Sequence, residues 1–112
     1  MTTNQFRHLA LSFSDATENS HHAHPDFRVR GRIFATMGYP DEGWGMVRLT
    51  PEQQDEAIHA FPGAFQPAAG MWGRSGSTVV RLSAIEAADL SPILRQAYDN
   101  LSRRKRSSRA LR

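Results

Sequence analysis

The sequence predicts a two-layer α+β domain, in which an antiparallel sheet carries helices on one face. Alternation of apolar and polar residues, typical of strands, dominates residues 27–49. Helical spacing of apolar residues occurs on both sides of that segment. The predicted elements follow the order α-β-β-β-α-β-β-α-α, and this order favours helices packed together against one sheet.

The chain begins with a predicted helix. Thr2 and Gln5 fit a capping box, in which each side chain bonds the backbone of the other residue. The apolar residues recur at helical spacing: Phe6, Leu9, Ala10 and Phe13. Residues 14–25 then predict a polar connection, and Pro25 favours an extended entry into the first strand.

Residues 27–49 predict a meander of three strands. The first two are joined across Arg30-Gly31-Arg32, and the third follows a turn cluster at residues 38–43. Alternation assigns one face to Phe27, Val29, Ile33, Ala35, Met37, Gly45, Val47 and Leu49. The other face receives Arg28, Phe34, Thr36, Trp44, Met46 and Arg48.

A second helix is predicted after the meander. Thr50 is the N-cap, Pro51 occupies the first helical position, and Gln53 closes a capping box. This helix ends near Ala60, and residues 62–76 predict mainly loop with a short strand at 64–66. A further strand at 77–82 turns Thr78, Val80 and Leu82 inward, and Val79 and Arg81 outward.

Two helices are predicted at the end of the domain. Ser83 and Glu86 form a capping box for a short helix that reaches Leu90. Ser91 and Pro92 then start a final helix. Its apolar stripe consists of Ile93, Leu94, Ala97, Tyr98 and Leu101.

Length and charge divide the chain into a body and a tail. Its 112 residues predict one domain over 1–102. Six of the 14 basic residues, and none of the 11 acidic ones, lie in 103–112, so the body carries a net charge of −3. We predict that this basic tail is disordered. The chain has no cysteine and no apolar run of signal-peptide or membrane-spanning length, so we expect a cytoplasmic protein without a membrane partner.

Three blocks of sequence resemble the MmcQ/YjbR-like family. They are residues 24–36, then Gly43-Trp44 with residues 49–54, and then residues 70–80, in the family's order and spacing. The likeness covers roughly residues 5–102. The resemblance implies a CyaY-like α/β fold and a DNA-binding label, which rests on the likeness of that fold to a double-wing arrangement. The arginine-rich tail lies outside it.

Two predicted loop tips are candidates for phosphate contact. Arg30 and Arg32 flank one tip, and Arg74 lies in the glycine-rich segment 73–76, beside Trp72. Guanidinium groups at loop tips reach phosphates, and glycine backbone N–H groups assist. Alternatively, such arginines only keep loops soluble and protect sheet edges.

The sheet face opposite the helices is a second candidate. Alternation places there Arg28, Phe34, Trp44, Met46, Arg48, Val79 and Arg81. Aromatic rings beside arginines form a platform on which bases stack while phosphates pair. The same residues suit a homodimer contact or a small acidic ligand. A half-covered face, with Trp44 and Phe34 beneath the 62–76 loop, is the structural alternative.

The sequence gives little support for metal binding or catalysis. His21, His22, His24 and Asp26 are the one metal-like cluster, and adjacent histidines in an extended chain point apart. We therefore predict no metal and no cofactor. The sequence lacks a nucleophile elbow, a phosphate-binding Gly-Lys-Ser/Thr loop and a dinucleotide fingerprint, so we predict that the protein is not an enzyme.

The leading hypothesis is a small DNA-binding module. Phosphate contacts would come from the loop tips and from tail residues Arg103, Arg104, Lys105 and Arg106. The alternative is a protein-interaction or small-ligand-binding domain that uses the open face around Trp44 and Trp72. A basic stripe joining Arg30, Arg32 and Arg74 would favour the first hypothesis. An acidic surface with an apolar groove at the two tryptophans would favour the second.

Overall fold

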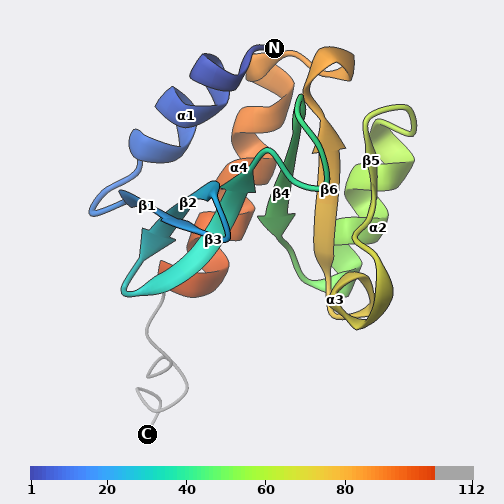
Figure 1. Ribbon diagram of the computed structural model, residues 1–112. Coiled ribbons are helices and arrows are strands. Elements are labelled where there is room, and N and C mark those ends of the chain that lie inside the picture. Colours follow the sequence, from blue (N-terminus) through green and yellow to red (C-terminus); the bar gives the residue numbers. More distant parts are fainter. Residues whose placement is uncertain (103–112) are drawn as a thin grey trace, which may run out of the picture.

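The computed structural model describes residues 1–102 as helices packed against a single sheet (Figure 1). The helices are α1 (Thr3–Leu11), α2 (Pro51–Ala60), α3 (Gly70–Arg74) and α4 (Ala87–Ser102), with a 3-10 turn at Leu82–Ala84. The strands are β1 (Thr17–His21), β2 (His24–Val29), β3 (Arg32–Met37), β4 (Trp44–Arg48), β5 (Phe65–Pro67) and β6 (Ser77–Arg81).

The six strands form one antiparallel sheet in the order β1-β2-β3-β4-β6-β5. Helix α4 runs behind β3 and β4 in Figure 1, and α1 packs beside it. We call the side covered by α1, α2 and α4 the helix face, and the other side the open face. The predicted fold class is confirmed, although the order of elements within it differs from the prediction at three places.

One hydrophobic core lies between the sheet and the helices. Phe6 of α1, Val47 of β4, Val80 of β6 and Leu94 of α4 are fully buried in it. The shared phase of the predicted strands and helices places eleven apolar side chains in one core. That core is confirmed, since every member is either buried there or packed against it: Phe6, Leu9, Phe13, Val29, Val47, Leu49, Ile58, Val80, Leu82, Leu94 and Tyr98.

The predicted caps of the first two long helices are also confirmed. Thr2 accepts a hydrogen bond from the backbone N–H of Gln5, whose side chain accepts one from the N–H of Thr2. Thr50 and Gln53 form the same reciprocal pair at the start of α2. These pairs satisfy backbone donors that a helix start otherwise leaves without partners.

The predicted polar connection at residues 14–25 is wrong, because it contains strand β1. This strand is an edge strand, and its side chains are mostly exposed, so it lacks the alternation that marks a half-buried strand. Its turn to β2 uses His22 and Ala23, both with positive φ, at 48° and 67°. Glycine or asparagine is the usual signal for that turn, so the hairpin had no sequence marker.

Two predicted side-chain directions in β3 are reversed by a bulge. Phe27 pairs with Ala35, while the next residue, Arg28, pairs with Ile33, so Phe34 is left without a partner. Phe34 is fully buried on the helix face, with its ring 5.6 Å from that of Tyr98. Ile33 shares the open face with Arg28. An extra residue in one strand shifts the alternation beyond it.

The two predicted C-terminal helices are one continuous helix, α4, which contains Pro92. Leu90 and Leu94 are both fully buried, one turn apart, so packing favours continuation through the proline. Proline lacks only one helical hydrogen-bond donor, and this one lies in the second turn of the helix.

Candidate functional site

The open face carries a row of half-buried and exposed side chains from the central strands. Trp44, Met46 and Arg48 of β4 alternate with buried Gly45 and Val47, as predicted. Cross-strand pairing places Arg81 opposite Trp44, and its guanidinium carbon lies 4.7 Å from the Trp44 ring centroid. Arg28 of β2 is on the same face, two strands away.

The segment predicted as a second loop tip is helix α3 instead. Gly73 and Arg74 end that helix rather than a hairpin. The backbone of Gly73 lies against Ala68, where an added Cβ would be 1.9 Å from the Ala68 carbonyl oxygen. The buried Gln54 side chain of α2 donates a hydrogen bond to the Gly73 carbonyl at 3.0 Å. Helix α3 is thus anchored to the body at its end.

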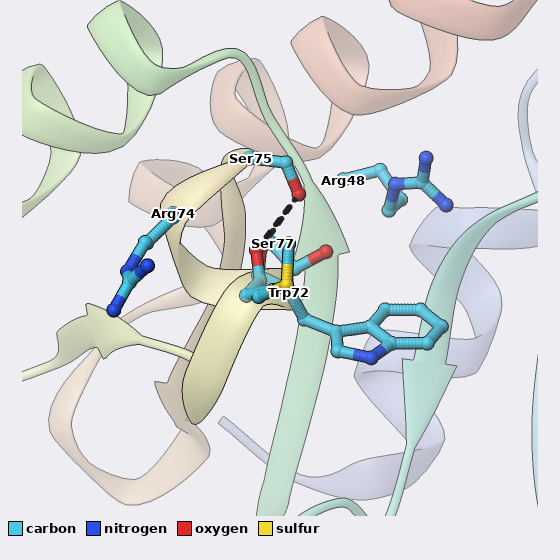
Figure 2. Close-up of a pocket in the computed structure, with 6 residues that line it drawn as sticks. Arg48, Trp72, Arg74, Ser75 and Ser77 are labelled. Atoms are coloured by element: carbon cyan, nitrogen blue, oxygen red, sulfur yellow. Dashed lines mark hydrogen bonds between the residues drawn. The ribbon is translucent and has the colours of Figure 1, made fainter.

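Helix α3 presents two exposed apolar side chains. Met71 is 75% exposed and Trp72 is 62% exposed. Exposed apolar patches are typical of interaction sites, so these two side chains are a candidate contact surface. Trp72 lies beside Arg48, and both side chains extend to the same side of α3 in Figure 2.

Trp72 separates two hollows. The first has a volume of about 300 Å³ and extends from Gly31 at the β2–β3 turn to Trp72. We call it the open-face hollow, and its lining residues are His21, Arg28, Gly31, Ile33, Ala35, Thr36, Met46, Arg48 and Trp72. The second is shallower and has a volume of about 490 Å³, with Arg48, Met71, Trp72, Arg74, Ser75 and Ser77 around it. Arg48 and Trp72 therefore border both hollows.

A buried acid lies next to the open-face hollow. Asp26 is fully buried and accepts hydrogen bonds from Arg28 Nε at 2.8 Å and from His21 Nδ1 at 2.7 Å. Burial by itself raises the pKa of Asp26, but the hydrogen bonds from Arg28 and His21 outweigh it and lower that pKa below its ordinary value of 3.8. Asp26 therefore holds the His21 and Arg28 side chains in place at the wall of the hollow.

Thr36 contributes a polar atom without a partner. Its side chain is 1% exposed, and its hydroxyl oxygen has no hydrogen-bond partner within residues 1–102. Pairing with Asp26 and Met46 across the sheet puts this side chain on the open face, at the lining of the hollow. Buried hydroxyl groups are normally hydrogen-bonded, so this one is a candidate for contact with a ligand.

Charges are segregated between the two layers. Within residues 1–102 the strands hold four arginines and two acids, and both acids are paired: Glu18 with Arg7, and Asp26 with Arg28. Helices α2 and α4 hold five acids and one arginine: Glu52, Asp55, Glu56, Asp89, Asp99 and Arg95. Helices α2 and α4 together therefore carry a net charge of −4 and the strands carry +2, while the connecting segments carry −3 through Asp15, Arg30, Asp41, Glu42 and Glu86.

The arginines predicted at loop tips do not form one stripe. Arg30 and Arg32 flank the β2–β3 turn as predicted, with Arg30 and Gly31 both at positive φ. Arg32 pairs with Val29 and so shares the side of the helix face. Arg74 points away from Trp72 and Arg48 in Figure 2. Tail residues 103–112 lie outside the described residues.

The sequence prediction put Thr36 on the open face, but it put Ile33 and Ala35 on the helix face and did not include His21 in the open-face site. Ile33 was misplaced because strict alternation does not allow for the bulge in β3. The one available sequence signal for this side of the hollow was the spacing of Asp26 and Arg28, because residues two positions apart on a strand share a face. Within residues 1–102, no three His, Cys, Asp or Glu side chains are arranged to hold a metal ion. No helix of that part of the chain is long and apolar enough to cross a bilayer.

Comparison with known proteins identifies the family and a structural neighbour. The family model described as YjbR matches residues 11–100. The crystal structure of the Deinococcus radiodurans protein DR2400, described with the domain DUF419, has a TM-score of 0.75 and 18% sequence identity. The alignment covers 98% of this chain and 87% of that one. No curated protein matches the sequence. The chain belongs to the YjbR family, and its structural neighbour supports the fold.

Proposed function

We propose that this YjbR-family protein binds DNA through the open face of its sheet, without catalysing a reaction. The segregation of charge is the observation that carries the proposal. A body with net charge −3 is a poor ligand for DNA if its charges are evenly mixed. Here five of the 11 acids lie on α2 and α4, behind the sheet, and the two acids of the strands are each paired with an arginine, so the strands can meet phosphates without strong repulsion from their own carboxylates.

Arg48 and Arg81 are the two open-face arginines that supply phosphate contacts in this proposal. Neither forms an ion pair with a carboxylate within residues 1–102, whereas Arg28 is paired with Asp26. Arg30, at the turn, extends the basic surface toward one end of the sheet. Guanidinium groups bind phosphate oxygens with two parallel hydrogen bonds, which fixes the orientation of the backbone on the protein.

The tail adds affinity that does not depend on the DNA sequence. Six basic residues in 103–112 neutralise up to six phosphates, and each contact contributes about −0.9 to the slope of log affinity against log salt. A slope of roughly −5 is expected if all six engage. A large part of the binding to DNA is then electrostatic. The contribution of the open face is the DNA affinity that remains once the tail charges are neutralised.

The decisive experiment compares two full-length proteins on a short DNA oligonucleotide, in single-stranded and duplex form, at low salt. One is the natural chain, and the other has the six basic residues of 103–112 replaced by glutamine. We expect the second protein to bind more weakly but measurably. Arg48→Ala in that background should reduce the salt slope by about 1, because one phosphate contact is lost.

The matched control is Arg95→Ala, which removes the same charge from the helix layer. Arg95 lies on α4, with its guanidinium carbon 5.4 Å from the centroid of the Phe13 ring. It should leave the salt slope unchanged. Loss of all DNA binding on neutralising the tail would refute the open-face proposal, as would equal effects of Arg48→Ala and Arg95→Ala.

A protein-interaction or small-ligand-binding domain is the second candidate. Exposed Met71 and Trp72 on α3 favour it, because adjacent apolar side chains on a surface are typical of contact sites. This candidate predicts that Met71→Ala and Trp72→Ala alter self-association or partner binding, while Arg48→Ala leaves them intact. Sedimentation velocity of the natural chain and of these variants tests self-association directly.

A further inference from the structure

We infer that the open-face hollow accepts an unstacked base of single-stranded DNA, with Trp72 as the stacking partner and Arg48 at the adjacent phosphate. This inference rests on the proposed function and assigns the form of DNA that the same face selects. Three features carry it: the exposed indole of Trp72, the size and lining of the hollow, and the unpartnered hydroxyl of Thr36.

Trp72 is presented as a stacking surface on an anchored helix. Its side chain is 62% exposed, yet its helix is held at the Gly73 carbonyl by the buried Gln54 side chain. The same Gln54 amide also donates to the Ser77 carbonyl at 3.1 Å, which ties α3 to the start of β6. An aromatic ring on an anchored element loses little conformational freedom when a base stacks on it, and each such stack contributes about 1–3 kcal/mol.

The hollow suits one planar group with a negative charge beside it. Its volume of about 300 Å³ lies at the lower end of the range for small-molecule sites. Ile33 and Met46 supply apolar walls, while Arg48 stands at the edge next to Trp72. This combination matches a nucleotide, in which a flat base and an anionic phosphate are joined by a sugar.

Thr36 provides the polar contact at the lining of the hollow. Its hydroxyl is buried and has no partner within residues 1–102. A hydroxyl can both donate and accept, and every base has donors or acceptors on its edge. A base that enters the hollow therefore supplies the hydrogen bond that this oxygen lacks.

Duplex DNA cannot use these features. Its bases are stacked on one another and paired, so an indole on the protein surface has no free base face to contact. Single strands expose base faces, and proteins that bind them combine aromatic platforms with a positively charged surface. The open face should therefore prefer a single strand to a duplex of the same sequence.

The test uses the full-length protein with its six tail charges replaced by glutamine, so that the tail does not mask the open face. Fluorescence anisotropy measures binding of a labelled single strand of about 12 nucleotides and of the duplex made with its complement. We expect tighter binding of the single strand. Trp72→Ala should weaken single-strand binding by about 5- to 150-fold, the range for one lost stack, and abolish the preference. Trp72→Phe, which keeps a ring, should restore part of it.

Two further variants separate stacking from general effects. Met71→Ala removes the more exposed neighbour of Trp72, and it should change single-strand affinity much less than Trp72→Ala does. Thr36→Val keeps the shape of the side chain and removes the hydroxyl, so it should weaken single-strand binding several-fold without lowering the thermal midpoint. Binding of a single-stranded RNA of the same sequence shows whether the open face distinguishes RNA from DNA. Tight binding of either single strand supports the inference.

The failures of the two proposals are distinguishable. If the tail-neutralised protein binds duplex at least as tightly as single strand, or if the preference survives Trp72→Ala, the inference is wrong and the proposed DNA-binding function stands. If this protein binds neither form at low salt, both are wrong.

Discussion

The helix face and the open face come from the same strands but differ in composition and packing. On the helix face, Phe27, Val47 and Val80 are almost completely removed from solvent by α1, α2 and α4. On the open face, Trp44 and Arg48 are half-buried, and Arg81 is exposed. One face therefore supplies stability through burial, and the other presents charge, aromatic rings and a hollow.

This difference indicates that stability and binding can be changed separately. Substitutions on the helix face should lower the free energy of unfolding and leave the DNA affinity of the folded protein unchanged. Substitutions at the open face should do the reverse. The positions where the two faces meet, at the β3 bulge, at Gly76 and at Asp26, test how far that separation holds.

The largest effect is expected for Phe34→Ala. Phe34 is fully buried against Phe13 and Tyr98, so its truncation leaves a cavity and should lower the free energy of unfolding by about 3–5 kcal/mol in urea denaturation. Its neighbour Ile33 is half-buried on the open face and is the matched control, with an expected loss of about 1 kcal/mol from Ile33→Ala. Equal losses would contradict the side-chain directions set by the bulge.

Gly76→Ala should come next, because Gly76 connects α3 to β6. It has φ of 113°, and an added Cβ would lie 2.0 Å from the Leu49 carbonyl oxygen. Strain and overpacking together should lower stability by roughly 2–5 kcal/mol. Gly31→Ala also has positive φ but meets no atom within 4 Å, so it should lose only about 1–2 kcal/mol. Calorimetry of both variants tests whether the steric contact adds to the strain.

Asp26→Asn should have an intermediate effect that depends on pH. The pKa of Asp26 is lowered in the folded protein, so its contribution is present above the ordinary pKa of 3.8 and is lost as pH falls through the folded pKa. At neutral pH the substitution should lower stability by about 1.5–3 kcal/mol, because the charge-assisted hydrogen bonds from Arg28 and His21 are weakened.

Urea midpoints from neutral pH down to below 3.8 measure this contribution. The variant should lose less stability than the natural protein over the acidic part of that range. An identical acid dependence of the two proteins would show that Asp26 does not control it. His21 and Arg28 line the hollow, so the variant should also weaken single-strand binding.

The smallest effect on stability is expected for Arg81→Ala. Arg81 is exposed, and its contact with the Trp44 ring is a cation–π interaction worth about 0.5–1 kcal/mol at such a site. DNA binding should weaken in the same variant, with the salt slope reduced by about 1. Arg81→Lys keeps the charge and is the control for the slope. A stability loss well above this range would mean that the open face also holds the fold together.

Much of the fold could be predicted because local rules agree with the tertiary structure there. The capping residues of α1 and α2, and the alternation of β4 and β6, depend on neighbours in the sequence. Arg28, Trp44, Arg48 and Arg81 were placed on the open face for the same reason. The predictions failed where strand pairing makes the structure without a side-chain pattern, as in β1, whose side chains are polar throughout and whose pairing with β2 alone makes it a strand.

The amino-acid sequence by itself determined the fold class, most of the core and the separation of basic tail from acidic body. Periodicity and charge are local properties that a reader can count along the chain. Tertiary structure alone decided that Phe34 turns inward, that α3 replaces a loop tip, and that Trp72, Thr36 and Arg48 surround one hollow. The last three come from separate elements, and α3 is anchored beside the sheet by a buried amide hydrogen bond. Neither this bond nor the bulge that turns Phe34 inward has a periodic signature.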